Sequence, residues 1–446
     1  MRKHILLAGV LAALIASYLP AQNIAGAWQG TLGLGGTQAL RLIMQFSPAD
    51  GGGWTAMQRS IDQGGWDHGM PASSVSVHDS VVTVAFPQLR GSYQGRLAAD
   101  GKTITGTWTQ NGVASPLEYE RPTPQTAWHD PSPHTVHLVT VEKGVQLEVL
   151  DWGGSGRPLV FLAGLGNSAH IFDDFARKLT STNHVYGISR RGFGASSTPA
   201  SGYSADRLGD DVLAVLDSLR INRPVLVGHS IAGEELSSVG SRHPERVAGL
   251  IYLDAGYPYA FYDRNQHNMQ IDMADLARKL EKLQAGPPAT SPDEFRRLIG
   301  ELANTDLPAF QRDLEELQKN LPPLPPRPAG PLPPPMPQPP SAMAAQAIIA
   351  GEQKYTDIRA PVLAIYALPH KAPSGLPDSA RAGFLAADSV RTGTQAAAFE
   401  HGIPTARVVR LPNADHYVFI SNEADVLREM HAFIDRLPPV LGSSRQ

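Results

Sequence analysis

One ten-residue stretch, residues 224–233 (PVLVGHSIAG), constrains the fold of this chain more than any other. Its first four residues are apolar, which is typical of a buried strand. Ser230 follows, and the small residues Gly228 and Ala232 stand two positions before and after it. This spacing favours a sharp strand-to-helix turn that exposes the serine hydroxyl, because small residues let neighbouring backbone pack against the turn. The alternative is an ordinary loop in which Ser230 caps the following helix, and the rest of the chain decides between them.

The first 21 residues have the composition of a secretory signal peptide. Arg2 and Lys3 precede an apolar run from Ile5 to Leu19, which is short for a membrane-spanning helix. Ala21 offers a small residue for cleavage, although Leu19 stands where a small residue is preferred. We therefore expect an exported protein, periplasmic or extracellular, with no stable membrane span after cleavage. An uncleaved N-terminal anchor is the alternative.

Composition excludes several classes of function. The chain of 446 residues contains no cysteine, so disulfides, thiolate metal sites and cysteine nucleophiles are ruled out. Its formal net charge of −4 gives no reason to expect nucleic acid as a partner. No cluster of metal ligands and no dinucleotide-binding loop stands out, so we expect no metal and no cofactor. The length suggests two or three domains, and the sequence leaves the oligomeric state open.

Residues 22–120 predict a separate β-rich domain. Short runs of β-branched and aromatic residues alternate with turn signals about every ten residues, which is typical of a small antiparallel barrel or sandwich. Two Gly-x-Trp segments, ending at Trp28 and Trp108, are candidates for the first and last strands that close the sheet. The pattern resembles small lipocalin-like modules of secreted bacterial proteins. Four residues are candidates for ligand contact, or else for core and solvated positions: Trp54, Trp66, Asp67 and His68.

A second region begins at residue 136 and alternates strands with helices. It follows a proline-spaced linker at residues 121–135. Residues 136–254 predict a hairpin and then buried strands separated by helical segments, and a further buried strand covers residues 361–366. This order predicts an α/β fold with a doubly wound, mostly parallel sheet. We assign residues 136–254 and 361–437 to this core and residues 438–446 to a tail.

Four motifs in this region carry a resemblance to a known family. In chain order they are Gly164-Leu165-Gly166, Arg191 to Ser196 (RGFGAS), the turn at Ser230 and the late pair Asp415-His416. Together they resemble the α/β-hydrolase fold family, over the chain from residue 136 to residue 437. The chain departs from the common pattern at Ala163, where a histidine is usual, and at Ser189, where an aspartate is usual.

Residues 255–360 stand where this family inserts a cap over the active site. Three segments have helical periodicity: residues 269–283, 292–302 and 307–317. Twelve of the twenty residues from 321 to 340 are proline, which excludes a regular helix there and predicts an extended segment. This segment is either a stiff loop of the cap or a ligand for the groove of a partner.

The resemblance implies a catalytic triad built on Ser230. A serine hydroxyl is a weak nucleophile near neutral pH and needs a general base held by an acid. His416, on the loop after the last strand, is the expected base. His229 adjoins the serine, but its side chain should point away. The resemblance also implies an oxyanion hole made by the backbone N–H groups of Leu165 and Ile231.

The acid of this triad departs from the common pattern. In most family members it follows the strand at residues 361–366, but here that strand leads to His370 with no carboxylate. Asp254 ends the preceding strand, and the carboxyl ends of adjacent parallel strands meet at one sheet edge, so Asp254 is the expected acid. Asp378 and Asp388 lie further along the chain, beyond easy reach. The alternative role of Asp254 is to cap a turn of the chain.

Together these residues predict a secreted serine hydrolase that cleaves a small-molecule carboxylic ester through an acyl-enzyme. Serine rather than aspartate at position 230 argues against the dehalogenases and epoxide hydrolases of the same family. Other reactions of the same triad stay as alternatives: amide or proline-iminopeptidase cleavage, C–C bond hydrolysis and cofactor-free peroxidase chemistry. A catalytically inactive binding protein on this fold is the alternative from another class.

Overall fold

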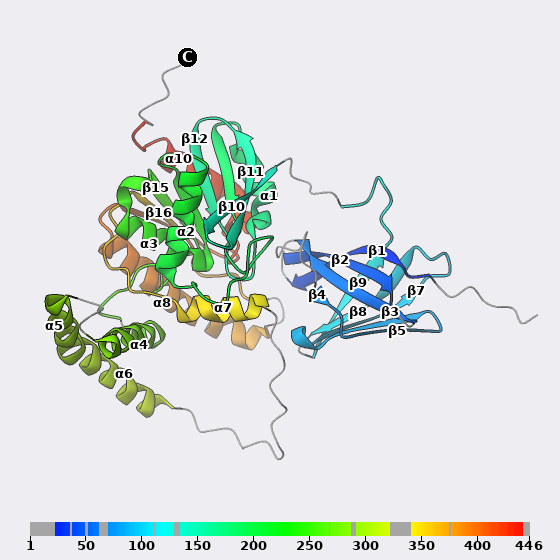
Figure 1. The fold of residues 1–446 in the computed structure, drawn as a ribbon, viewed down its shortest axis with the longest axis horizontal. Helices are drawn as coiled ribbons and strands as arrows, with labels where there is room; N and C mark the ends of the chain where they lie inside the picture. The colour runs from blue at the N-terminus through cyan, green and yellow to red at the C-terminus, as the bar shows by residue number, and fades with distance from the viewer. Residues whose placement is uncertain are drawn as a thin grey trace, which may run out of the picture.

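The computed structural model describes residues 23–35, 38–49, 52–61, 70–110, 112–128, 134–266, 268–286, 291–321, 340–373 and 376–439. Two sheets form in this part of the chain, each with its own hydrophobic core (Figure 1). The predicted signal peptide, residues 66–68 and the prolines of residues 322–339 lie outside the described residues. Among the described helices, none is long and apolar enough to cross a membrane.

The front region is a β-rich, antiparallel sheet, as its sequence predicts. Its strands run in the spatial order β4-β3-β2-β1-β9-β8-β7-β6-β5. They are β1 (Gly26–Gly35), β2 (Gln38–Pro48), β3 (Trp54–Ser60), β4 (Met70–Pro71), β5 (Ser74–His78), β6 (Val81–Phe86), β7 (Gly91–Leu97), β8 (Thr103–Gln110) and β9 (Val113–Glu120). Alternate residues of β6 are buried, and this two-residue period matches the alternation of side chains across a pleated strand.

The prediction that the Trp108 segment is the last strand is wrong. Trp108 lies on β8, and β9 follows it and pairs with β1, where Gln29 stands opposite Glu120. The cause is the turn at Gly112, whose φ of +80° folds β9 back along β8 before the sheet meets β1. Trp28 and Trp108 are both buried in the core of this sheet, and Trp54 packs against it.

The second sheet has eight strands in the order β10-β11-β13-β12-β14-β15-β16-β17. They are β10 (Thr135–Glu142), β11 (Val145–Gly154), β12 (Arg157–Leu162), β13 (Asn183–Ile188), β14 (Val225–His229), β15 (Gly249–Leu253), β16 (Val362–Ala367) and β17 (Ala406–Leu411). The pairs β10–β11 and β11–β13 are antiparallel, and all others are parallel. The doubly wound, mostly parallel sheet is therefore confirmed.

Helices cover both faces of this sheet. One face packs against α2 (Ala205–Ser218), α3 (Gly233–Arg242) and α8 (Asp378–Gly402). The other packs against α1 (Asp173–Ala176) and α10 (Glu423–Ile434). Every residue of β14, β15 and β16 is buried, as expected for central parallel strands covered on both sides.

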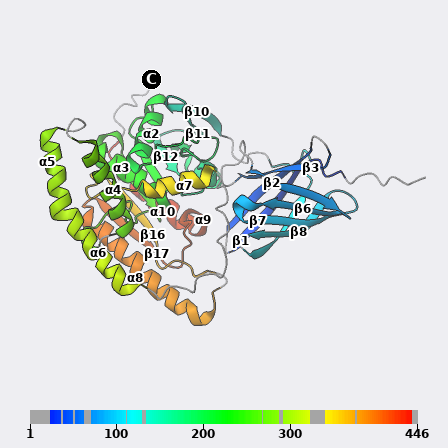
Figure 2. The same ribbon diagram turned by 60° about the horizontal axis from the view of Figure 1, so that its bottom comes forward.

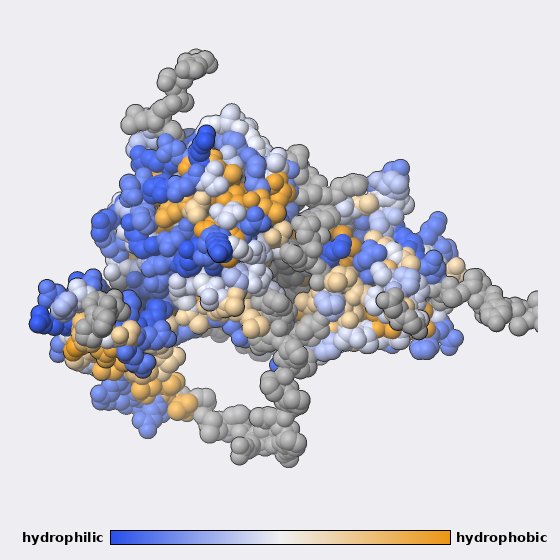
Figure 3. Space-filling view, viewed as in Figure 1, coloured by the Kyte–Doolittle hydropathy of each residue, from blue (hydrophilic) through white to orange (hydrophobic). Residues whose placement is uncertain are grey.

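The described residues between β15 and β16 form four α-helices. They are α4 (Met269–Ala285), α5 (Pro292–Glu301), α6 (Leu307–Asn320) and α7 (Pro340–Ala350), with a π-helical turn at Leu302–Asp306. The first three match the predicted helical segments, and α7 has no counterpart in the sequence analysis. α4, α5 and α6 stand beside the core, whereas α7 lies against the core in both views (Figure 1 and Figure 2). Apolar side chains are exposed on α5 and α6 (Figure 3).

A buried ionic cluster supports the edge of the core sheet. His170 lies between Asp173, 3.3 Å from its Nδ1, and Glu148, 3.4 Å from its Nε2. The indole of Trp152 donates to Asp173 at 3.0 Å. Burial alone would lower the pKa of His170, but the hydrogen bonds and charges of Asp173 and Glu148 raise it to about 10. The imidazolium of His170 therefore lies between two buried carboxylates and helps to neutralise them, and His134 Nδ1 lies 3.6 Å from the Asp173 carboxylate.

This cluster predicts a pH-dependent contribution to stability. Because the folded pKa of His170 lies above its unfolded value, the contribution is complete below pH ~6.5 and is lost as the pH rises toward about 10. His170→Gln should lower the free energy of unfolding by about 3 kcal/mol at pH 6 and by clearly less at pH 9.5. Urea unfolding followed by circular dichroism measures both values. The partly exposed His243 supplies the control, His243→Gln, and an equal loss at both pH values in His170→Gln would contradict the assignment.

Candidate active site

Ser230 sits on a strained turn between β14 and α3. Its φ is +53°, in the left-handed region that side chains other than glycine rarely adopt. A Cβ added at Gly228 would lie 2.6 Å from Leu236 Cδ1, and one added at Gly233 would lie 2.1 Å from the Ala255 carbonyl oxygen. The turn thus closes because glycines stand at the two crowded positions beside it. Ser230 itself is only partly buried, and its side chain forms a hydrogen bond with Tyr259.

The sheet brings the candidate residues to one edge. β14, β15, β16 and β17 are neighbours in that order and are all parallel. Ser230 follows β14, Asp254 follows β15, His370 follows β16 and His416 lies beyond β17. Carboxyl ends of parallel strands form the usual place of a ligand site in open α/β sheets. Residues separated by more than 180 positions in the sequence therefore meet at this edge.

Asp254 and His416 form a short hydrogen bond, in which Nδ1 of His416 donates to Oδ2 of Asp254 at 2.6 Å. Asp254 is fully buried, whereas the His416 side chain is 37% exposed. The other oxygen of Asp254, Oδ1, accepts the backbone N–H of Ala367 at 3.0 Å. With Nδ1 engaged as a donor, Nε2 of His416 is the nitrogen left to accept a proton.

Electrostatics keep Asp254 ionised. Burial alone would raise its pKa, but hydrogen bonds from His370 and then from His416 outweigh burial and lower the pKa to about 2. A φ of +45° at Asp254 adds backbone strain at the same point. Strain of this kind persists only where the surroundings fix the residue firmly. An acid held charged and immobile next to a partly exposed histidine is the arrangement that general-base catalysis needs.

His229 supports the loop that carries His416. Its Nε2 lies 3.0 Å from the backbone carbonyl oxygen of His416, and the two rings lie 4.7 Å apart. Burial and the neighbouring His416 lower the pKa of His229 to about 3, so the ring is neutral and donates through Nε2. No motif in the sequence predicted this role for His229. The signal available in the sequence is the position of His229 next to Ser230, because the acceptor of its hydrogen bond is a backbone atom 187 residues away.

The loop that contains Leu165 packs directly on the serine turn. A Cβ added at Gly164 would lie 3.2 Å from Ser230 Cβ and 2.8 Å from His229 Nδ1. Ile231 follows Ser230 within the short 3-10 turn Ser230–Ala232 that precedes α3. The two residues expected to form the oxyanion hole therefore lie on segments adjoining Ser230. Their role in stabilising an oxyanion stays a prediction.

An apolar cluster lies between this site and the cap. The side chains of Leu165 and Ile231 pack with Phe193, and two residues of α7, Ala344 and Ile348, complete the contact. A Cβ at Gly192 would lie only 2.5 Å from Ala344 Cβ, so the loop after β13 also touches α7. α7 and Tyr259, both within residues 255–360, therefore pack against the serine turn.

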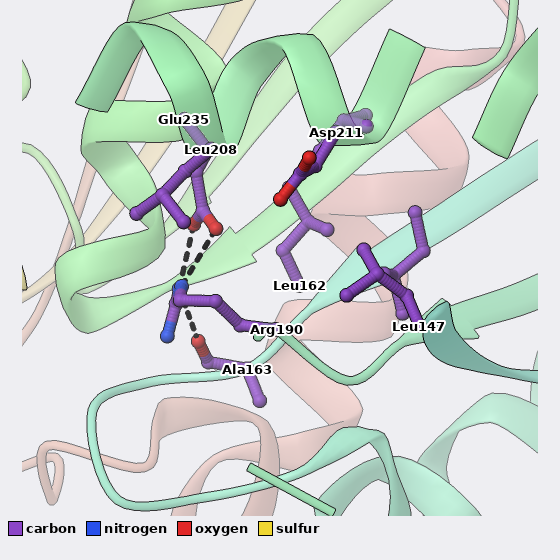
Figure 4. Close-up of a pocket in the computed structure, with 9 residues that line it drawn as sticks. Leu147, Leu162, Ala163, Arg190, Leu208, Asp211 and Glu235 are labelled. Carbon is purple, nitrogen blue, oxygen red and sulfur yellow. Dashed lines mark hydrogen bonds and ion pairs between the residues drawn. The ribbon is translucent and has the colours of Figure 1, made fainter. Parts of the chain in front are cut away.

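A buried ion pair locks the serine helix to the loop before Leu165. Nε and Nη2 of Arg190 each donate to Glu235 of α3 at 2.6 Å, and Nη2 also donates to the Ala163 carbonyl at 2.9 Å (Figure 4). The small internal cavity beside this pair has a volume of about 10 Å³. Such a volume holds about one water molecule and excludes a substrate. Arg190 thus serves the geometry of the site rather than binding a reactant.

Two groups of described residues bring together three atoms that are able to bind a metal ion. One consists of His134, His170 and Asp173, and the other of Asp254, His370 and His416, each with its nitrogen and oxygen atoms within 4.8 Å of one another. Most of these atoms also take part in the hydrogen bonds and ion pairs described above. The expectation of no metal stays a prediction.

Comparison with known proteins decides the family. The sequence profile described as "Alpha/beta hydrolase family" matches residues 159–429, more than half of the chain. The chain belongs to the alpha/beta hydrolase family. The match spans both parts of the core and the insertion between them, and it confirms the fold and the general class of enzyme that the resemblance implied.

Individual relatives of this hydrolase carry different names. It is 32% identical over 173 residues to an AB hydrolase superfamily protein of Bacillus subtilis, covering 38% of this chain and 64% of that protein. It is 32% identical over 146 residues to a non-heme chloroperoxidase of Streptomyces lividans, covering 31% of this chain and 52% of that protein. Both matches span less than two thirds of the relative. A solved thermophilic esterase of Thermogutta terrifontis is 18% identical, with a TM-score of 0.41, covering 68% of this chain and 98% of that one.

The packing of Gly164 on the serine turn predicts the effect of a single methyl group. Gly164→Ala places Cβ 2.8 Å from His229 Nδ1, so either the loop or the serine turn must shift. A displacement near 1 Å at a reacting centre costs up to about a hundredfold in rate, and we expect kcat/KM to fall about ten- to a hundredfold. Steady-state kinetics on a small ester measure this. Gly383→Ala on α8, where a Cβ meets nothing within 4 Å, is the control and should be near normal.

Proposed function

We propose that this protein is an exported serine hydrolase that cleaves small-molecule carboxylic esters with Ser230, His416 and Asp254. The observation that carries the proposal is the 2.6 Å hydrogen bond from His416 Nδ1 to the buried Asp254, at the sheet edge where Ser230 occupies its strained turn. Export rests on the signal-like residues 1–21. Ser230 and Asp254 follow the adjacent strands β14 and β15, and His416 lies beyond β17, two strands further along the same sheet.

The mechanism follows from the roles of the three side chains. His416 Nε2 removes the proton from the Ser230 hydroxyl as the oxygen attacks the ester carbonyl. Asp254 holds the ring of His416 and stabilises the imidazolium that forms. The backbone N–H groups of Leu165 and Ile231 stabilise the oxyanion, after which His416 donates its proton to the departing alcohol. Water activated by His416 then cleaves the acyl-enzyme and releases the acid.

A second reaction of the same acyl-enzyme is favoured by one comparison. The Streptomyces lividans relative is named a non-heme chloroperoxidase, and a protein of Rhodococcus erythropolis with 31% identity over 145 residues is named a non-heme haloperoxidase. Attack of hydrogen peroxide instead of water on the acyl-enzyme would release a peracid. Ester hydrolysis with and without hydrogen peroxide, assayed for peracid, distinguishes the two outcomes.

We also propose that the front region is a closed, lipocalin-like barrel. Its edge strands β4 and β5 follow one another in the chain, so one continuous segment contacts both ends of the sheet. The Ala72 N–H donates to the Ala56 carbonyl of β3, and the Ser73 N–H donates to the Ala85 carbonyl of β6, each at 2.9 Å. Closure of this kind removes the open edges that would otherwise be free to pair with other chains.

Ser230→Ala should remove essentially all ester hydrolysis, because no other group supplies the nucleophile. We expect kcat/KM to fall at least a thousandfold, with an unchanged circular dichroism spectrum. A fluorophosphonate probe should label the wild-type protein at Ser230, located by peptide mass spectrometry, and should not label Ser230→Ala. Labelling of another residue, or retention of more than about a thousandth of the rate, would contradict the assignment. A wild-type protein that neither hydrolyses esters nor takes the probe would favour the inactive binding protein.

Asp254→Asn should lower kcat by roughly three to four orders of magnitude, because the amide can hold His416 in the wrong tautomer. The melting temperature should fall as well, because Asn removes the buried charge that the His370 and His416 rings contact. Asp378→Asn is the matched control, because the Asp378 carboxylate is fully exposed on α8. Steady-state kinetics on the same ester check both variants. Near-normal turnover in Asp254→Asn would remove Asp254 from the triad.

A further inference from the structure

His370 joins the candidate acid to a second carboxylate. It follows β16 and directs Nε2 to Oδ2 of Asp254 at 2.7 Å. Its Nδ1 lies 3.0 Å from Oδ2 of Asp388 on α8, whose Oδ2 also accepts the His370 backbone N–H at 2.8 Å. The expectation that Asp388 lies beyond reach of the site is therefore wrong in one respect: Asp388 reaches Asp254 through His370. The sequence concealed this because α8 was not predicted.

Both nitrogens of His370 face carboxylates, and this fixes its protonation. A neutral imidazole has one N–H donor, so it would leave one carboxylate facing a lone pair. Only the doubly protonated ring donates to Asp254 and Asp388 together. Asp388 is itself held as an anion by Arg391, which donates to its Oδ1 at 2.8 Å. The two carboxylates therefore stabilise a cation at His370.

Two further titratable groups among the described residues lie near His370. Besides the two carboxylates, the hydroxyl of Tyr257 lies 3.4 Å from Nε2 of His370 and donates to Asp254 at 3.1 Å. The ring of His416 lies 6.2 Å from that of His370. Burial alone would lower the pKa of His370, but Asp254 and then Asp388 raise it to about 9.

We propose that His370 is a positioning residue. Asp388 holds His370 as a cation, and this cation keeps Asp254 in place. The cation also weakens the attraction of Asp254 for a proton on His416. The proposal rests on the proposed function of the Ser230, His416 and Asp254 triad. His370 and His416 share one oxygen, Oδ2 of Asp254, so the charge of one ring opposes a proton on the other. The cation at His370 and a proton on His416 therefore compete for the same oxygen.

The test measures the titration of His416 in the full-length protein. His370→Gln keeps an amide donor for Asp254 but removes the cation, and Asp388→Asn leaves His370 without its second anion. We expect the acidic limb of the pH profile of kcat/KM, measured with 4-nitrophenyl acetate, to move upward by about one pH unit in His370→Gln. Asp388→Asn should move it in the same direction by less. His401→Gln, an exposed histidine at the end of α8, is the matched control and should not move it.

A second measurement does not depend on catalysis. Histidine ring resonances, titrated by NMR in the Ser230→Ala background with and without His370→Gln, report protonation of His416 directly. An upward shift of the His416 titration in the double variant supports the proposal. A purely structural role would leave the titration and the pH profile unchanged and would only lower the rate uniformly or lower the melting temperature. That result would overturn the proposal. Should His370→Gln fail to fold, Asp388→Asn alone decides the matter by the same readouts.

The outcomes separate this proposal from the proposed function. Absence of ester hydrolysis and of fluorophosphonate labelling in the wild-type protein overturns the triad. The NMR titration still reports in that case whether His370 controls the protonation of His416. Full activity with no shift in either variant retains the triad and overturns the role of His370.

Discussion

The buried carboxylate of Asp254 is the charge on which the geometry of this site depends. An ionised carboxylate with no solvent contact is costly unless donors surround it, and removing a partner from such a group costs about 3–5 kcal/mol. Asp254 receives its donors from His416, His370, Tyr257 and the Ala367 backbone, which lie on loops and strands around β15, β16 and β17. Satisfying this one charge therefore fixes the relative placement of three loops.

Close backbone packing supplies the second constraint. Gly164, Gly228 and Gly233 stand where a Cβ would collide with the serine turn or with the loop of Asp254. The positive φ of Ser230 is tolerated because its neighbours leave the turn no other conformation. The buried ion pair of Arg190 and Glu235 connects the loop after β13 to α3. The reacting hydroxyl is thus placed by groups that take no part in chemistry.

Other regions of the chain lie outside this frame. α7 packs over Leu165 and Ile231, next to the serine turn. The remaining cap helices expose apolar residues such as Leu307, Leu314 and Leu317. The front sheet has a core of its own and adds none of the residues of the proposed triad. This division lets the cap vary while the charge and packing around Asp254 stay constant.

Local sequence determined the features that depend on neighbours along the chain. The period of apolar residues predicted the buried strands and three helices of the insertion. Small residues around Ser230 predicted the turn because the steric requirement is local. Strand order then predicted that Asp254 and His416 approach each other.

Tertiary structure alone decided the contacts that join distant segments. His370 bridges Asp254 and Asp388 because α8 returns along β16. The spacing of these residues in the sequence does not predict this contact. His229 donates to a backbone carbonyl, an acceptor that every residue carries and that no motif marks. α7 has a weakly amphipathic sequence, so its place over the site follows from its apolar contacts with Leu165, Ile231 and Phe193 rather than from a periodic pattern. Local sterics and periodicity are encoded residue by residue, whereas the partners of a buried charge are set only when the strands assemble.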